Sequence, residues 1–177
     1  MTVNGIVARY RSAGVLVDAN LLLMYFVGVF DREAIPRFKR TSKFTPEDFD
    51  LLYGFLSNFE RVVTTPHILT EVSNLAGQLP DHLRERVFEK LELGIPLLEE
   101  RYTASKTIAS GAPFVRFGLT DSAVLYHARG QYLVLTDDFR LSQYLHHEGV
   151  AVFNFNQVHR GFSCSTPGKA PLIFRMK

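Results

Sequence analysis

Gly14-Val15-Leu16-Val17-Asp18 decides the fold, because a short apolar run here ends abruptly in a carboxylate. An uninterrupted run of β-branched and aliphatic residues is typical of a strand that is buried on both faces of a parallel sheet. The apolar segment that follows, from about Asn20 to Val29, predicts a helix that is buried or packs on another chain. A strand that leads directly into a helix favours an α/β layer architecture.

The rest of the chain continues this alternation, which predicts a mostly parallel sheet. Further strands are predicted at residues 61–65, 132–135 and 150–155. Helices are predicted to begin at hydroxyl or acidic caps and at prolines, namely at Thr45, Pro66, Pro80, Thr120 or Asp121, and Asp137 or Asp138. Residues 97–110 are also predicted to be helical, whereas 31–44 are predicted to form a loop.

The composition is that of one ordinary globular domain, with 177 residues of which 46% are hydrophobic and 21% charged. The single cysteine, Cys164, excludes an internal disulfide and a CxxC zinc site, and this favours a reducing compartment. The N-terminus has no signal-peptide core, and the apolar run Leu21 to Phe30 is too short for a bilayer. We therefore expect a cytoplasmic protein with a domain over residues 1–158 and a tail or docking arm over 159–177.

The formal net charge of +2 is too small to indicate a nucleic-acid-binding protein by itself. A local basic run does occur, and it is interleaved with aromatic residues: Arg37, Phe38, Lys39, Arg40, Lys43 and Phe44. A solvated loop and a surface that contacts phosphate groups are both compatible with this run.

Carboxylates occur where ligands bind in parallel α/β sheets, beyond the carboxyl ends of the strands. Asp18 follows the first strand, and Asp137 and Asp138 follow a later one. Glu71 lies in the helix after the second strand, and Asp121 lies near the start of the helix before the fourth. If the first and fourth strands are neighbours, these acids meet at one edge of the sheet.

Converging carboxylates raise one another's pKa, and a divalent cation removes that cost. Oxygen-only ligands suit Mg²⁺ or Mn²⁺ and not zinc. A pair of such ions is a common device for displacement at phosphorus. Each acid also has a simpler explanation, because Asp121 and Asp138 could be helix caps, worth about 1 kcal/mol each, and Glu71 could be a solvated helix residue.

Four segments resemble the PIN domain family and occur in the family's order: VLVDAN at 15–20, TPHILTEVSN at 65–74, GLTDSAVLYHA at 118–128 and YLVLTDDFRL at 132–141. The resemblance covers about residues 13–158. It implies a three-layer α/β/α fold around a central parallel sheet. It also implies Mg²⁺- or Mn²⁺-dependent ribonuclease activity.

The resemblance assigns roles to particular residues. The family's four acids, expected to be catalytic and to bind metal, fall on Asp18, Glu71, Asp121 and Asp138. Three neighbours are expected to orient these acids: Asn20, Thr136 and Asp137. Asp18, Asp121 and Asp138 would hold one ion, with Glu71 at a second or reaching the first through water. Phosphate contacts are expected from Arg37, Lys39, Arg40 and Lys43, and less strongly from Arg140.

Partners follow from the same resemblance, since many PIN proteins are VapC-type toxins that an antitoxin holds inactive. This chain is longer than those, through the loop at 30–45 and the tail at 160–177, so the resemblance to a nuclease is closer than to a toxin. The apolar helix favours a homodimer or another protein partner. A non-catalytic PIN-like module that binds RNA or protein is the alternative.

Other enzymes that place an acid after a strand fit less well. A phosphatase of the haloacid dehalogenase type needs an Asp at position 20, where this chain has Asn20. A dinucleotide-binding domain needs a Gly-rich turn after the first strand, and VDANLL has none. His67 and Glu71, four residues apart, are a weaker basis for a zinc site.

Overall fold

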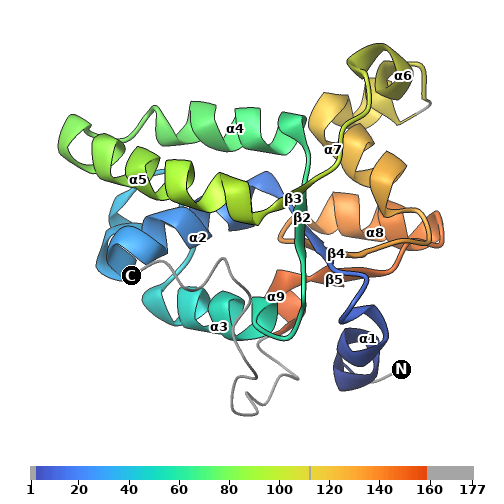
Figure 1. The fold of residues 1–177 in the computed structure, drawn as a ribbon, viewed down its shortest axis with the longest axis horizontal. Helices are drawn as coiled ribbons and strands as arrows, with labels where there is room; N and C mark the ends of the chain where they lie inside the picture. The colour runs from blue at the N-terminus through green and yellow to red at the C-terminus, as the bar shows by residue number, and fades with distance from the viewer. Residues whose placement is uncertain (1–2, 112, 159–177) are drawn as a thin grey trace.

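A parallel sheet organises the chain, which a computed structural model describes over residues 3–111 and 113–158. Within these residues the sheet has five strands in the order β3-β2-β1-β4-β5, and every pair is parallel (Figure 1). The strands are β1 Val15–Val17, β2 Val62–Thr64, β3 Glu99–Glu100, β4 Leu133–Thr136 and β5 Val152–Asn154. The predicted α/β fold with a central parallel sheet is therefore confirmed. The predicted tail, 159–177, lies outside the described residues.

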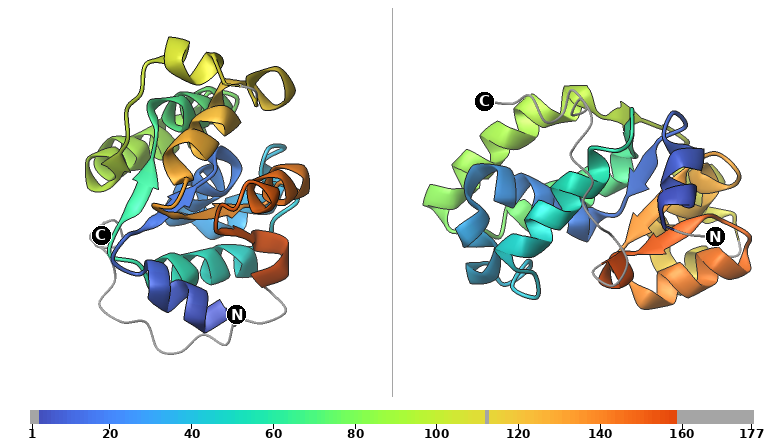
Figure 2. Two further views of the ribbon diagram at one scale, coloured as in Figure 1. Left: turned by 90° about the vertical axis from the view of Figure 1, so that its right-hand side faces the viewer. Right: turned by 90° about the horizontal axis from the view of Figure 1, so that it is seen from below.

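Helices cover both faces of this sheet, which gives three layers. In Figure 1 and in the left view of Figure 2, α4 and α7 lie above the sheet and α1 and α3 lie below it. The helices are α1 Val3–Tyr10, α2 Ala19–Asp31, α3 Pro46–Leu56, α4 Pro66–Ala76, α5 Asp81–Gly94, α6 Ser105–Ala109, α7 Phe114–Ala128, α8 Phe139–His147 and α9 Phe155–Val158, with 3-10 turns η1 Arg32–Arg37 and η2 Ile95–Leu97.

The core is centred on β1 and α2. Val15, Leu16 and Val17 are fully buried, and α2 is buried from Leu21 to Gly28. Helices α3, α4 and α5 of the same chain pack around α2, so its apolar character needs no second chain. The predicted homodimer therefore loses the support of this helix and stays a prediction. None of the helices that the structure describes has the length and apolarity to cross a membrane.

Local sequence signals fix several helix starts as predicted. Thr45 and Asp48 form a reciprocal capping box at the start of α3, with Pro46 in the first turn. At the start of α4 the Thr65 side chain accepts a hydrogen bond from the backbone N–H of Ile68. These caps set the direction in which each helix leaves the sheet.

Three local predictions differ from the structure, and one helix was not predicted. Residues 97–110 contain the strand β3 and only the short helix α6, because the acidic pair Glu99–Glu100 forms an edge strand that lacks the usual apolar pattern. The predicted loop at 31–44 begins with the 3-10 turn η1. The last strand ends at Asn154, where α9 begins, and α1 was not predicted.

Gly14 sets the entry into β1 and gives a test of the fold. Its φ is +114°, and an added Cβ would lie 3.0 Å from the carbonyl oxygen of Arg61. We expect Gly14→Ala to lower the free energy of unfolding by about 1–3 kcal/mol through backbone strain, with the clash adding to this. The control is Gly130→Ala, where φ is +71° and a Cβ would meet nothing within 4 Å. In urea unfolding, a loss at Gly14 no larger than that at Gly130 would contradict this packing.

Candidate functional site

Side chains from five elements, α2, α4, α7, β4 and α8, and from the residues that precede them surround one small pocket of about 130 Å³ at the carboxyl ends of β1 and β4. Because β1 and β4 are hydrogen-bonded neighbours, with Val17 opposite Leu135, the residues that follow them meet at the sheet edge. The pocket is lined by all four predicted acids and by two of the predicted orienting residues: Asp18, Glu71, Asp121, Asp138, Asn20 and Thr136. The sequence separations are long, so only the sheet topology brings them together.

Asp18 is buried and held in a fixed orientation. Its Oδ1 accepts a hydrogen bond from the N–H of Leu21 at 2.9 Å, and its Oδ2 accepts one from the N–H of Asp137 at 3.0 Å. The Thr136 side chain hydrogen-bonds to the same carboxyl group. Burial, followed by the charge of Asp137, nevertheless raises the pKa of Asp18 to about 7. Asp18 therefore caps α2 and cannot turn away from the pocket.

Asp138 combines the two roles that its sequence position suggested. Its Oδ1 caps α8 by accepting hydrogen bonds from the N–H groups of Arg140 and Leu141, at 2.7 and 3.0 Å. Its own N–H donates to the Thr136 Oγ1 at 3.0 Å, so Thr136 connects Asp18 with Asp138. The helix cap uses one oxygen, and within the described residues Oδ2 accepts no hydrogen bond.

Asp121 is not a helix cap, which corrects one of the sequence-based alternatives. It lies inside α7, three residues after Gly118, whose φ of 78° and ψ of −170° interrupt the helix. Burial raises the pKa of Asp121 to about 7, and the charges of Asp138 and Glu71 add to this. Among the described residues, neither the Asp121 nor the Glu71 side chain has a hydrogen bond or an ion pair. The repulsion between these carboxylates is therefore not offset by a hydrogen bond or an ion pair from the described residues.

Asp137 points into a different environment. Its carboxylate forms an ion pair with Lys43 and accepts a hydrogen bond from the Asn20 amide at 3.2 Å. Asn156 donates to its backbone carbonyl at 3.1 Å. Asn20 thus acts on the acids only indirectly, because it holds Asp137, whose backbone N–H holds Asp18. Asp138 lines the pocket and Asp137 does not, as the sequence analysis favoured.

The predicted phosphate-contacting residues do not line the acid pocket. Lys43 is engaged by Asp137, and Arg40 donates to the side chain of Gln78 at 2.9 Å. Arg37 and Lys39 are exposed around the end of η1. The expected contact of these four residues with phosphate stays a prediction. Lys43 could make such a contact only by breaking its ion pair with Asp137.

A basic pocket of about 350 Å³ on α8 was missed by sequence reasoning, apart from Arg140. It is lined by Arg116, Arg140, Gln143, Tyr144, His147 and Glu148. The Arg116 guanidinium stacks over the rings of Phe117 and Tyr144, at 4.9 and 5.6 Å from their centroids. Within the described residues neither arginine has a carboxylate partner. The dipeptide Arg116-Phe117 indicates that a cation and an aromatic ring lie close together. It does not indicate that α8 packs beside them, which completes the pocket.

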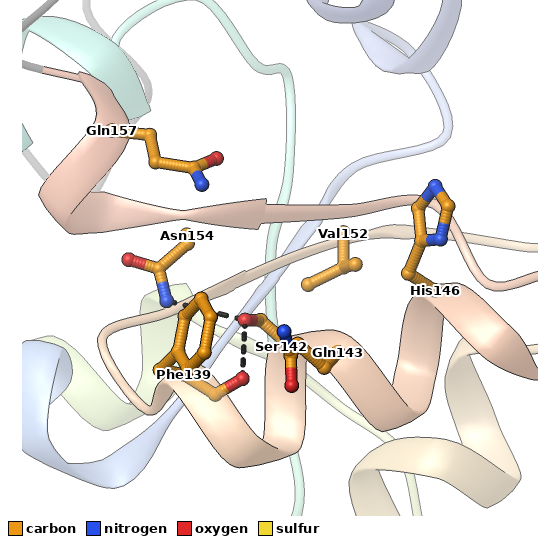
Figure 3. Close-up of a pocket in the computed structure, with 7 residues that line it drawn as sticks. All are labelled: Phe139, Ser142, Gln143, His146, Val152, Asn154 and Gln157. Atoms are coloured by element: carbon orange, nitrogen blue, oxygen red, sulfur yellow. Dashed lines mark hydrogen bonds between the residues drawn. The ribbon is translucent and has the colours of Figure 1, made fainter.

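A larger pocket on another side of α8, about 450 Å³, contains no acid (Figure 3). Figure 3 shows Ser142 facing Asn154, and its hydroxyl accepts from the Asn154 amide at 3.2 Å and donates to the Phe139 carbonyl at 2.9 Å. The pocket shares no lining residue with the acid pocket. Its lining offers no carboxylate, so the candidate metal site is the smaller pocket.

The acid pocket fits a hard divalent cation by its chemistry. All its candidate ligands are oxygen atoms, and burial together with the charges of Asp138 and Glu71 disfavours the ionised form of Asp121. Within 3–111 and 113–158, no three His, Cys, Asp or Glu side chains are already close enough to hold an ion. The acids would therefore close inward on a cation, which Asp121 and Glu71 can do because no hydrogen bond to a described residue holds them.

Neither a protein family nor a curated protein matches the chain.

Asp121→Asn gives a pH-dependent test of how strongly burial and the neighbouring acids disfavour the ionised Asp121 side chain. The pKa of Asp121 is raised from 3.8 to about 7 on folding, so its contribution to stability is present below pH 3.8 and lost as the pH rises to 7. At pH 8 the ionised side chain costs on the order of a few kcal/mol in the metal-free protein. We expect Asp121→Asn to raise the free energy of unfolding at pH 8 and to change it little near pH 4.

The measurement is urea unfolding between pH 4 and pH 8 in EDTA. The control is Glu85→Gln, which removes the same charge from an exposed position on α5. A gain from Asp121→Asn that does not grow with pH would show that the folded state does not disfavour the ionised Asp121 side chain.

Proposed function

We propose that this protein is a divalent-metal-dependent ribonuclease that hydrolyses RNA phosphodiester bonds at the acid pocket. The observation that carries the proposal is the convergence of Asp18, Glu71, Asp121 and Asp138 around one pocket. Among the described residues none of the four has an ion-pair partner. Such an arrangement is costly alone, and Mg²⁺ or Mn²⁺ would offset the cost. The segments that resemble the PIN domain family contribute all four acids, which supports the same proposal.

The four acids would divide the binding of metal. Asp18, Asp121 and Asp138 would hold one ion, and Glu71 would hold a second or reach the first through water. Asp18 is suited to this because backbone N–H groups fix its orientation, and Asp138 keeps Oδ2 for the ion while Oδ1 caps α8. Thr136 would keep these two ligands in register, since it hydrogen-bonds with both.

The chemistry on RNA needs a nucleophile and stabilisation of charge on the phosphate. When bound, Mg²⁺ or Mn²⁺ lowers the pKa of a water and neutralises charge on the phosphodiester. The chain's own contribution is to fix the ligands and to guide the RNA backbone. Arg140 is a candidate for this, because it lines the basic pocket on α8, the helix that Asp138 caps. Arg116 lines the same basic pocket.

An RNA cleavage assay with Mn²⁺ or Mg²⁺ tests the proposal. We expect wild-type protein to cut single-stranded RNA, EDTA to abolish cleavage, and Asp18→Asn or Asp121→Asn to reduce it by roughly a hundredfold or more. Glu85→Gln, which removes an exposed charge on α5, should cut like the wild type. Asp121→Asn guards against misfolding, since it is expected to fold at least as stably as the wild type.

Two outcomes would contradict a metal-dependent nuclease. One is cleavage by Asp121→Asn at the wild-type rate in a preparation whose melting temperature is no lower than that of the wild type. The other is RNA binding by the wild type without any cleavage in Mn²⁺ or Mg²⁺, which would favour a non-catalytic RNA-binding module.

A further inference from the structure

A second pocket, of about 480 Å³, opens directly beside the acid pocket. Its lining residues come from α4, the segment after β3, α6 and α7. These elements lie in the upper part of Figure 1. Both pockets are lined by Glu71 and Thr120, so they are adjacent. Its remaining lining residues are Pro66, His67, Thr70, Asn74, Tyr102, Ser105 and Leu119. A group bound here would lie next to whatever occupies the acid pocket.

Tyr102 is the most distinctive residue of this second pocket. It lies between β3 and α6, and 76% of its surface is exposed, the second highest value among the exposed large hydrophobic residues that are described. Aromatic rings usually bury a large area in proteins, so an exposed ring that lines a pocket is available to stack on a ligand. No other aromatic ring of the described residues stacks on it. A flat, free ring next to a phosphate-chemistry pocket suits stacking of a nucleobase.

This pocket is lined by both apolar and polar side chains, with Glu71 as its one carboxylate and His67 as its one basic side chain. Lys and Arg are absent from its lining, so it is unsuited to a phosphate group. The His67 Nε2 and the Ser105 Oγ form a hydrogen bond of 3.0 Å between α4 and α6. The Thr70 hydroxyl donates a hydrogen bond to the Pro66 carbonyl. The exposed Asn74 amide has no hydrogen bond to the described residues and can pair with a base edge. A nucleobase is uncharged and flat, with polar groups along its edges, so it suits a pocket with this lining.

We propose that this pocket, with Tyr102 as its stacking platform, binds the base of an unpaired nucleotide adjacent to the phosphodiester at the acid pocket. The inference rests on the proposed function and defines its substrate as single-stranded RNA. Inside a duplex the base is stacked on both sides and cannot reach a protein ring without being extruded. Stacking tolerates every base, so Tyr102 gives affinity with little sequence preference, and any preference would come from Asn74.

The test measures binding in EDTA, where cleavage plays no part. Fluorescence anisotropy of labelled eight-nucleotide oligo(A), oligo(U) and oligo(C) RNA is compared for wild type, Tyr102→Ala and Tyr102→Phe. We expect Tyr102→Ala to weaken RNA binding by about tenfold, and Tyr102→Phe to stay close to wild type because the ring remains. The matched control is Phe88→Ala, an exposed aromatic on α5 that lines neither pocket. Circular dichroism checks that each variant is folded.

Inorganic polyphosphate, a polyanion without bases, separates stacking from charge. Its binding should be the same for wild type and Tyr102→Ala, and an RNA duplex of equal length should bind more weakly than the single strands. The proposal is overturned if Tyr102→Ala binds RNA like the wild type, if it weakens RNA and polyphosphate equally, or if the wild type binds no single-stranded RNA.

The two proposals fail separately. If Tyr102→Ala weakens RNA binding but no RNA is cut in Mn²⁺ or Mg²⁺, the base pocket stands and the nuclease does not. If RNA is cut and Tyr102→Ala neither binds nor cuts differently from wild type, the nuclease stands and the base pocket does not.

Discussion

Repulsion between carboxylates at the end of a parallel sheet is the constraint on which this structure depends. Two unit charges 4 Å apart at a protein surface repel by about 4 kcal/mol. Here the strand order places Asp18 beside the end of β4, and backbone N–H groups prevent its side chain from turning away. Asp121 is repelled by both Asp138 and Glu71. Only protons or cations can offset that repulsion, and at neutral pH a divalent cation does so more completely.

The contrast with Asp137 separates the acids into two groups. Asp137 is as buried as Asp18, but the chain supplies Lys43 and Asn20 to satisfy it. Such an acid contributes to the structure, because its backbone N–H fixes Asp18. The acids that line the pocket receive no cation from the described residues, so their charge is left for an external ion. The basic side chains Arg116 and Arg140 and the exposed ring of Tyr102 lie on the elements around them, where a nucleic acid strand would need them.

Much of the site could be predicted because its residues stand at positions with a physical meaning. Asp18 and Asp138 follow buried strands directly, and parallel strands end at one edge, so their meeting required only that β1 and β4 be neighbours. The helix starts at Thr45 and Pro66 could be predicted from local signals, because Thr45 caps α3 by a hydrogen bond and Pro66 has a fixed φ that suits the first turn of α4. Contacts between distant segments gave no such signal. The pairing of Lys43 with Asp137, the edge strand Glu99–Glu100 and the pocket around Tyr102 depend on how whole elements pack, and no short stretch of sequence encodes them.

The central claim is that the four carboxylates form one binding site for a divalent cation. Crystals grown with Mn²⁺ and measured near the manganese absorption edge test it most directly, because anomalous scattering locates the ion without assumptions about its ligands. The account predicts an anomalous peak within the pocket, about 2.0–2.4 Å from carboxylate oxygens of at least two of Asp18, Asp121 and Asp138. Crystals of Asp121→Asn grown and measured in the same way should show a weaker anomalous peak or none. An empty pocket at saturating Mn²⁺, or manganese bound only elsewhere, would contradict the account.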